Sequence, residues 1–200
     1  RAYQGFYHDS QLYTLQALAR LGPADGLAMD VFLRFGSHDR YTIFSSLYAL
    51  AIDAWGVEAA ARTLMIVGQL AWVAAAAYLA SSVLVGHARW AGLALLAGLP
   101  GFYGAGEVFR FAEPFLTPRI FAEALVLLGL ALGLRKRTLL AAAAMLLALA
   151  LHPLMAAGGA LCLACVALSP RYPWMVPAAV VAGLVAAVLF HGLNGVRLIL

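Results

Sequence analysis

Polar and apolar positions divide the chain into a mixed first part, residues 1–56, and an apolar remainder with short polar interruptions. The apolar runs fall at Thr63–Gly86, Trp90–Pro100, Ile120–Leu134, Thr138–Leu151, Leu154–Leu168 and Pro173–Phe190. The first run carries no charge and is long enough to cross a hydrocarbon core of about 30 Å. This pattern predicts an all-α protein, in which residues 57–200 form a polytopic transmembrane helix bundle of about six segments, some of them short.

The first part of the chain predicts a polar outer loop that contains short helices. Leucines spaced three residues apart indicate a helix over Ser10–Leu21, and a glycine–proline turn follows at residues 22–26. Ser37 or Asp39 is placed to cap a second helix that runs from Tyr41 to Trp55. Because this second helix carries an aspartate among apolar residues, we expect it to be partly buried or to lie at the membrane surface.

Composition supports a membrane protein and excludes several other classes. Hydrophobic residues make up 64% of the chain and charged residues 11%, whereas soluble globular proteins average about 45–50% and about 25%. The net charge of +4 is small and dispersed, so we expect no nucleic-acid partner. Cys162 and Cys165 lie in an apolar run and form neither a disulfide framework nor a metal motif. Without a phosphate-cradling glycine-rich loop, nucleotide-driven chemistry is not expected.

Basic residues in short loops set the predicted orientation. Arg135-Lys136-Arg137 is the densest basic cluster, and we expect it on the cytoplasmic side. Alternation of the spans then places residues 1–56, residues 101–118 and His152 together on the opposite side. The Thr138–Leu151 run reaches only about 21 Å as a helix. We therefore expect His152-Pro153 to lie at the floor of a cavity.

The two ends of the chain look like internal positions of a longer protein. The chain begins at Arg1 in polar, aromatic sequence and finishes in an apolar stretch. We expect truncation at both ends and a membrane anchor before Arg1. The sequence does not indicate the oligomeric state.

Tyr7-His8-Asp9-Ser10-Gln11-Leu12-Tyr13 is the first group that could carry chemistry. Asp9 stands at the start of a helix between a histidine and aromatic residues, where a carboxylate can accept a proton from a sugar or lipid hydroxyl. His8 and Gln11 are candidates for contacting the substrate. The alternative is structural, with Asp9 or Ser10 simply capping the helix.

A second group combines Thr117-Pro118-Arg119 with Glu123, four residues further on along one face of a helix that the proline can begin. An ionisable residue inside an apolar run usually faces a cavity or a partner. Arg119 could hold a phosphate, with Glu123 keeping it in place. The alternative is a purely structural ion pair between them. Three nearby charged residues could extend this network: Glu107, Arg110 and Glu113. Of these, Arg110 could also hold the phosphate itself.

His152-Pro153 separates two apolar runs, and its imidazole could contact a phosphate or serve only as a hydrogen-bonded residue of a helix interface. The predicted topology places His152 on the same side as Asp9 and Arg119. We therefore predict that these three residues gather around one pocket. Small residues predict helix contacts elsewhere, in a Gly129/Gly133 pair and in Gly158-Gly159.

These motifs resemble the GT-C superfamily, polytopic membrane glycosyltransferases that use polyprenyl-phosphate sugars, and are most similar to bacterial glycosyltransferase-like membrane proteins. The matching features are the motif at residues 7–13, Phe115–Arg119 followed by Ala122-Glu123, and a basic turn before a helix that ends in Leu151-His152-Pro153-Leu154. The resemblance covers most of the chain, and a full member would be longer.

The resemblance implies an inverting glycosyltransferase in the bacterial inner membrane, with its active face periplasmic. Asp9 would deprotonate an acceptor hydroxyl, while Arg119, Arg110 and His152 would balance the charge of the leaving phosphate. Membrane lipids and the polyprenyl-phosphate sugar are the implied partners. Position 10 is Ser where some members have a second adjacent acid. The requirement for a divalent metal therefore stays open, and no other cofactor is implied.

Two other classes remain open from the sequence. A transporter or lipid-handling protein without chemistry would use Arg119, Glu123 and His152 as a substrate or proton path, although no inverted repeat is visible. A structural subunit would use its polar residues only to hold helices together. A common cavity would weigh against the structural subunit, and a turnover assay would separate the enzyme from the transporter.

Overall fold

The structure is a computed structural model that describes residues 2–22, 29–36, 38–98, 102–103, 109–110, 113–168, 170–171, 178, 181 and 185. Its helices are α1 (Asp9–Leu21), α2 (Phe44–Trp55), α3 (Val57–Val83), α4 (Ala88–Gly98), α5 (Pro118–Leu134), α6 (Thr138–Leu151) and α7 (Pro153–Leu168). Two single-turn helices, η2 (Phe32–Gly36) and η3 (His38–Tyr41), precede α2. The predicted all-α class is confirmed, apart from an antiparallel pair of two-residue strands, β1 (Phe102–Tyr103) and β2 (Phe109–Arg110).

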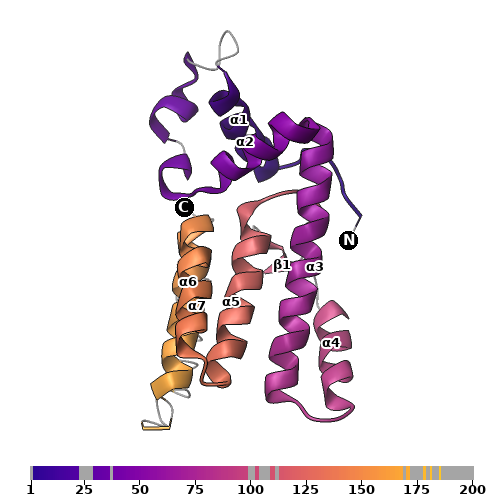
Figure 1. The fold of residues 1–200 in the computed structure, drawn as a ribbon, viewed down its shortest axis with the longest axis vertical. Helices are drawn as coiled ribbons and strands as arrows, with labels where there is room; N and C mark the ends of the chain where they lie inside the picture. Colours follow the sequence, from indigo (N-terminus) through magenta and orange to yellow (C-terminus); the bar gives the residue numbers. More distant parts are fainter. Residues whose placement is uncertain are drawn as a thin grey trace, which may run out of the picture.

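The helices form two parts, a bundle and a head (Figure 1). In the bundle, α3, α5, α6 and α7 lie side by side, and α4 lies beside the half of α3 that is distant from the head. The head (residues 2–55) lies across the other end of the bundle. Two hydrogen bonds join it to the end of α6: the Thr42 hydroxyl donates to the Leu151 carbonyl oxygen (2.7 Å), and the Ile43 N–H donates to that of Ala150 (3.0 Å).

Local sequence explains where the helices around this junction begin. Thr117 is extended, and Pro118 fills the first position of α5, where the missing N–H has no intrahelical partner to lose. His152 is likewise extended and ends α6, and Pro153 begins α7. The N–H of Met155 donates to His152 Nδ1 (3.4 Å), so His152 caps α7. The His-Pro step is therefore a helix break built from a cap and a proline.

Small residues let α5 pack closely against its neighbours, as the sequence predicted. A Cβ on Gly129 would lie 2.9 Å from Met145, one on Gly133 would meet a leucine of α7, and one on Gly159 would lie 2.6 Å from both methyl groups of Val126. Gly158 is different, because a Cβ there would meet no atom within 4 Å. The prediction is confirmed for three of the four glycines and wrong for Gly158.

Several predictions for the head need correction. The first helix agrees closely with the expected range, but the second begins at Phe44 rather than at Tyr41. Asp39 does not cap it, because its carboxylate accepts hydrogen bonds from Arg20 (2.5 Å) and from the Ser45 hydroxyl. Ser37 lies outside the described residues, as do most of the predicted turn at residues 22–26 and most of the predicted span Pro173–Phe190.

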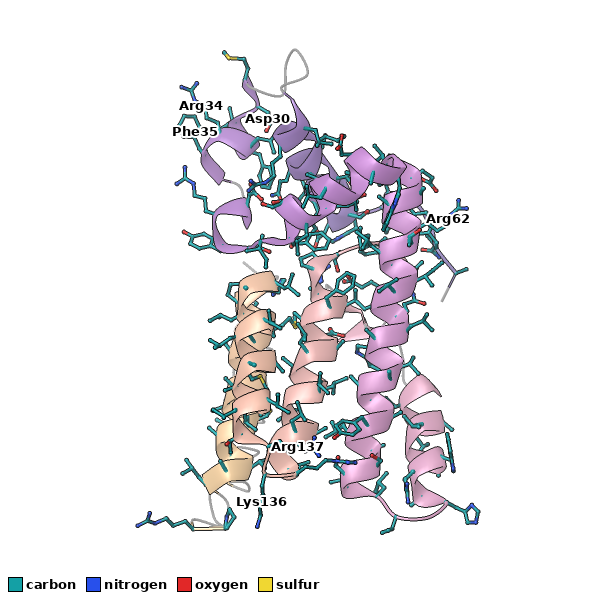
Figure 2. The ribbon with its side chains drawn as sticks, in the orientation of Figure 1. Asp30, Arg34, Phe35, Arg62, Lys136 and Arg137 are labelled. Carbon is teal, nitrogen blue, oxygen red and sulfur yellow. The ribbon has the colours of Figure 1, made fainter. Side chains whose placement is uncertain are left out.

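The surface of the bundle is apolar along its length. Among the described helices, α3 is the one that is both long and apolar enough to cross a membrane, while α6 and α7 are apolar but shorter. Large apolar side chains on their outer faces are exposed, including Leu70, Val73, Leu139, Leu146 and Leu161. Lys136 and Arg137 lie at the end of the bundle opposite the head, as Figure 2 shows. The predicted separation of the basic turn from residues 1–56 is therefore confirmed.

Candidate functional site

A cavity of about 430 Å³ lies where the head meets the bundle. Its walls come from three distant parts of the sequence, contributing Asp9, Tyr13, Tyr41, Thr42, Arg119, Leu151, His152, Pro153 and Leu154. The prediction that Asp9, Arg119 and His152 gather around one pocket is confirmed. Their chemical roles stay predictions.

The beginnings of three helices meet at this cavity. Asp9 is the first residue of α1, Arg119 the second residue of α5, and His152 the cap of α7. A helix N-terminus carries partial positive charge and N–H groups without intrahelical partners, which together favour an anion. The opposing C-terminal carbonyls of α6 accept hydrogen bonds from Thr42 and Ile43. The backbone around the cavity therefore favours negative charge.

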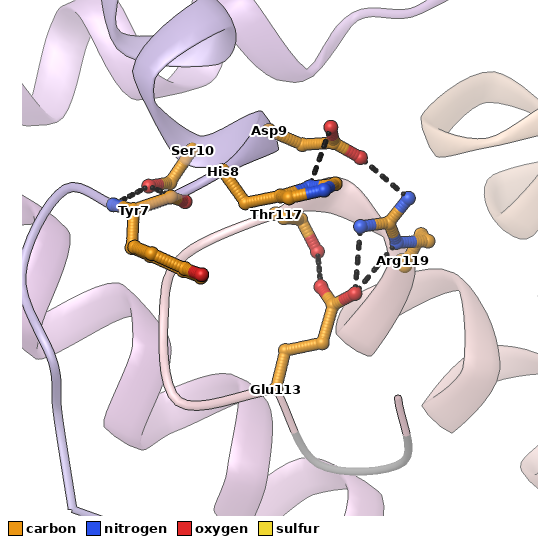
Figure 3. Close-up of polar contacts among 7 residues, drawn as sticks. All are labelled: Tyr7, His8, Asp9, Ser10, Glu113, Thr117 and Arg119. Atoms are coloured by element: carbon orange, nitrogen blue, oxygen red, sulfur yellow. Dashed lines mark hydrogen bonds and ion pairs between the residues drawn. The ribbon is translucent and has the colours of Figure 1, made fainter. Parts of the chain in front are cut away.

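Asp9 connects the head to the bundle through its carboxylate (Figure 3). Its Oδ2 accepts a hydrogen bond from Arg119 Nη1 (2.8 Å), and its Oδ1 lies 2.9 Å from His8 Nδ1. The capping alternative is wrong for both residues considered. The cap position of α1 is His8, with no side-chain capping bond, and the Ser10 hydroxyl instead bonds the Tyr7 N–H and carbonyl.

Arg119 is held on its other side by Glu113. Glu113 Oε1 accepts from Arg119 Nε (2.9 Å) and lies 2.6 Å from Nη2, while the Thr117 hydroxyl donates to Glu113 Oε2. The Glu113 side chain is 2% exposed and that of Arg119 is 7% exposed. Burial raises the pKa of Glu113, and Arg119 and the Thr117 hydrogen bond oppose that rise. Arg119 thus compensates a carboxylate that has almost no contact with water.

The carboxylate that holds Arg119 is Glu113, whereas the sequence predicted Glu123. Glu123 Oε2 accepts a hydrogen bond from Trp72 Nε1 (3.1 Å), which joins α5 to α3. The error came from assuming that the partner had to lie within the helix. Glu113 precedes α5, and the chain folds back at Pro114 so that its carboxylate meets the first turn.

His8 lies behind Asp9, away from the cavity walls. Its ring stacks on Phe115 with a centroid separation of 6.3 Å, and its side chain is 52% exposed. Its backbone has φ +53° and ψ −133°, a conformation that strains a residue with a Cβ by about 1–3 kcal/mol and recurs at functional sites. We expected His8 to contact substrate, but its contact is with the Asp9 carboxylate.

The remaining predicted residues separate into different places. Gln11 donates a hydrogen bond to the Phe6 carbonyl oxygen (3.2 Å) on an exposed face. It therefore holds the segment that precedes α1 and does not line the cavity. Arg110 belongs to β2, and its side chain lies outside the described part of the structure. Glu107 also lies outside the described residues.

Tyr13 is a cavity residue that sequence reasoning missed. It lies one turn after Asp9 on α1, and this four-residue spacing was the available signal. Burial raises the pKa of Tyr13 to about 12, so its hydroxyl stays a hydrogen-bond donor at physiological pH. Asp9 and Tyr13 also line a second, smaller cavity of about 70 Å³ together with Leu12, Gln16 and Phe32.

An apolar cavity of about 360 Å³ shares one lining residue with the larger cavity. It lies between α3 and α5 and is lined by Ala71, Ala74, Ala75, Tyr78, Phe121, Ala124, Leu125, Leu128 and Leu151. Leu151 lines both cavities. The charged groups of the larger cavity and the apolar walls of its neighbour together suit an amphipathic ligand.

The described residues do not fit a divalent metal. Within that part of the chain, no three His, Cys, Asp or Glu side chains are grouped to hold an ion. The two site carboxylates already face a guanidinium, which competes with a cation for the same oxygens.

Comparison with known proteins gives no family for this chain, so any functional proposal depends on the site described above. The chain matches no protein-family model, no curated protein and no solved structure.

Proposed function

We propose that the chain is part of a polytopic membrane glycosyltransferase of the GT-C type that transfers a sugar from a polyprenyl-phosphate donor to an acceptor hydroxyl. One observation carries this proposal: Asp9 and Arg119 share a cavity at three helix N-termini, directly beside an apolar cavity. A lipid-linked phosphate needs positive charge for its head and an apolar surface for its chain. An inverting transfer also needs a carboxylate beside the reacting carbon.

The apolar outer surface of the bundle supports a membrane location. In the proposed arrangement α3 spans the bilayer, and α5, α6 and α7 complete a multi-pass bundle around it. Leu139, Leu146 and Leu161 would then face lipid, where exposed leucines are favourable. Lys136 would lie in the cytoplasm under the rule for basic residues in short loops, and the cavity would open on the periplasmic side of a bacterial inner membrane.

In this proposal the donor phosphate lies in the larger cavity near Arg119 and the beginning of α7. The first isoprene units lie in the apolar cavity. Leu151, which lines both cavities, lies between the phosphate and the isoprene units. His152 already accepts a backbone hydrogen bond at Nδ1, so its other ring nitrogen is the one suited to donate to a phosphate oxygen.

Asp9 would act as the base for the acceptor hydroxyl, whose oxygen attacks the anomeric carbon as the bond to the phosphate breaks. Arg119 contacts Asp9 in the resting state. When Asp9 takes up the proton, its negative charge disappears and the pull on Arg119 weakens. Arg119 stays paired with Glu113 through Nε and Nη2, and its Nη1 side then turns from Asp9 to the leaving phosphate while negative charge develops there. The small cavity that Asp9 and Tyr13 also line offers the acceptor hydroxyl an approach.

Turnover of a lipid-linked sugar tests the proposal. The purified protein in liposomes would be given a panel of polyprenyl-phosphate hexoses and pentoses together with a panel of hydroxyl-bearing acceptors (sugars, peptides and lipids), and release of polyprenyl phosphate measured. We expect Asp9→Asn to abolish release, whereas Asp53→Asn, an exposed aspartate on α2, should leave it unchanged. Near-normal release by Asp9→Asn would remove Asp9 from the mechanism. Saturable lipid binding without release by the wild type would favour a lipid-handling protein instead.

A further inference from the structure

The His8 imidazole is placed to control which oxygen of Asp9 faces the cavity. Asp9 Oδ1 lies 2.9 Å from His8 Nδ1, and Asp9 Oδ2 faces Arg119. These two atoms are close enough for the ring to restrain the position of Oδ1. His8 does not line the cavity, and half of its side chain is exposed to solvent.

The backbone conformation of His8 supports a specific role rather than incidental contact. Its φ of +53° disfavours any residue with a Cβ. The surrounding structure nevertheless fixes it: the Ser10 hydroxyl bonds both backbone groups of Tyr7, and the His8 ring stacks on Phe115. Strained residues persist where their geometry is determined by the environment, and they concentrate at functional sites. A glycine would satisfy this turn without strain but could not hold Asp9.

We propose that His8 is a positioning residue for Asp9. This inference rests on the proposed function of Asp9 in sugar transfer. The contact of His8 Nδ1 with Oδ1 fixes the carboxylate plane, so that Oδ2 stays turned toward Arg119 and the cavity and accepts the proton of the acceptor hydroxyl.

The other charged groups near the ring are consistent with this pairing. Tyr7 packs against the ring at a centroid distance of 6.2 Å, and the segment before α5 contributes the uncharged Phe115. Glu113 and Arg119 reach His8 only through Asp9. Asp9 is therefore the carboxylate that the His8 ring contacts in the described structure.

Two substitutions separate the contact with Asp9 from the shape of the turn. His8→Asn keeps a side-chain N–H that can reach Asp9. His8→Gly removes the ring and relieves the backbone strain, so lost activity would not reflect a strained turn. With a polyprenyl-phosphate sugar as probe, we expect His8→Gly to lower kcat about tenfold or more with little change in KM, because the carboxylate is no longer held in place. We expect His8→Asn to retain most of the wild-type kcat.

Two outcomes would overturn the positioning role: a His8→Gly enzyme with the wild-type kcat, or a His8→Asn enzyme as impaired as His8→Gly. A second measurement needs no turnover. The NMR chemical shifts of the His8 ring should change on Asp9→Asn and stay unchanged on Asp53→Asn, because Asp9 is the carboxylate that the ring contacts. If the wild type transfers no sugar, the proposed function fails; if the ring signals ignore Asp9→Asn, the His8–Asp9 contact itself fails.

Discussion

Arg119→Met would remove the one cation that both Asp9 and Glu113 contact among the described residues. Glu113 is 2% exposed, so it would remain as a buried carboxylate with only the Thr117 hydroxyl opposite it. Breaking a buried pair by removing one partner typically destabilises a protein by about 3–5 kcal/mol. Asp9 is 28% exposed and retains His8, so it contributes little of this loss. We expect a loss of about 3 kcal/mol in the free energy of unfolding at neutral pH.

The loss should depend on pH in a direction that the site fixes. Burial already raises the pKa of Glu113 in the wild type, and removal of Arg119 takes away its main opposing influence. A carboxyl with a raised pKa in the folded state binds its proton more tightly there than in the unfolded chain. Stability therefore falls as pH rises above the ordinary carboxyl range. We expect the loss to be small near pH 5 and to grow by at most about 1.4 kcal/mol per pH unit.

The assay is unfolding of the purified protein in detergent micelles, followed by tryptophan fluorescence at several pH values. Arg135→Met is the matched control, because Arg135 lies at the other end of α5 and bonds Ser81 and Ser82 in an exposed position. We expect that control to lose less than about 1 kcal/mol. Adding Glu113→Gln to Arg119→Met should restore much of the lost stability. A pH-independent loss, or no restoration by Glu113→Gln, would refute the reasoning.

Three further predictions concern packing, ionisation and topology. Gly159→Ala should destabilise the bundle by about 1–3 kcal/mol in the same unfolding assay, because the added Cβ would overlap Val126 of α5. The control Gly158→Ala should be neutral or stabilising by up to about 1 kcal/mol. Equal effects of the two substitutions would refute the contact between α5 and α7. Burial raises the pKa of Tyr13 to about 12, so its contribution to stability should be lost between pH 10 and about 12. Burial also raises the pKa of Tyr3 to about 12 and that of Tyr48, so Tyr13→Phe should lower the amplitude of the late step in the tyrosinate absorbance titration by one tyrosine without abolishing it. On a background without native cysteines, a cysteine at Lys136 should react with impermeant reagents only from the cytoplasmic side and one at Tyr7 only from outside; labelling of both from one side would contradict the topology.

Sequence patterns were sufficient for α5, α6 and α7 because their ends are determined locally, whereas α3 begins at Val57, six residues before the predicted run. The run over Thr138–Leu151 became α6 with the same ends, since a basic turn precedes it and a His-Pro step follows it. The start of α5 followed in the same way from Pro118. In the head, tertiary contacts decided instead: Asp39, a good capping residue by type, bonds Arg20 and Ser45.

The sequence was enough to predict the main residues that line the candidate site, but not which of their side chains contact one another. Topology alone brought Asp9, Arg119 and His152 to one end of the bundle. The choice of Glu113 over Glu123 as the partner of Arg119 depends on how a non-helical segment folds back, and no periodicity encodes that path. The contact between His8 and Asp9 depends on a positive φ that sequence gives no reason to expect outside glycine.

The claim on which the account depends is that three distant segments form one cavity for one lipid phosphate. Photo-labelling with a diazirine-bearing polyprenyl phosphate, followed by peptide mapping, measures this directly. We predict saturable labelling of peptides from both the start of α5 and the α6–α7 break, competed by unlabelled polyprenyl phosphate and weakened by Arg119→Met. Labelling confined to the outer faces of α3 and α4, and insensitive to competitor, would contradict it.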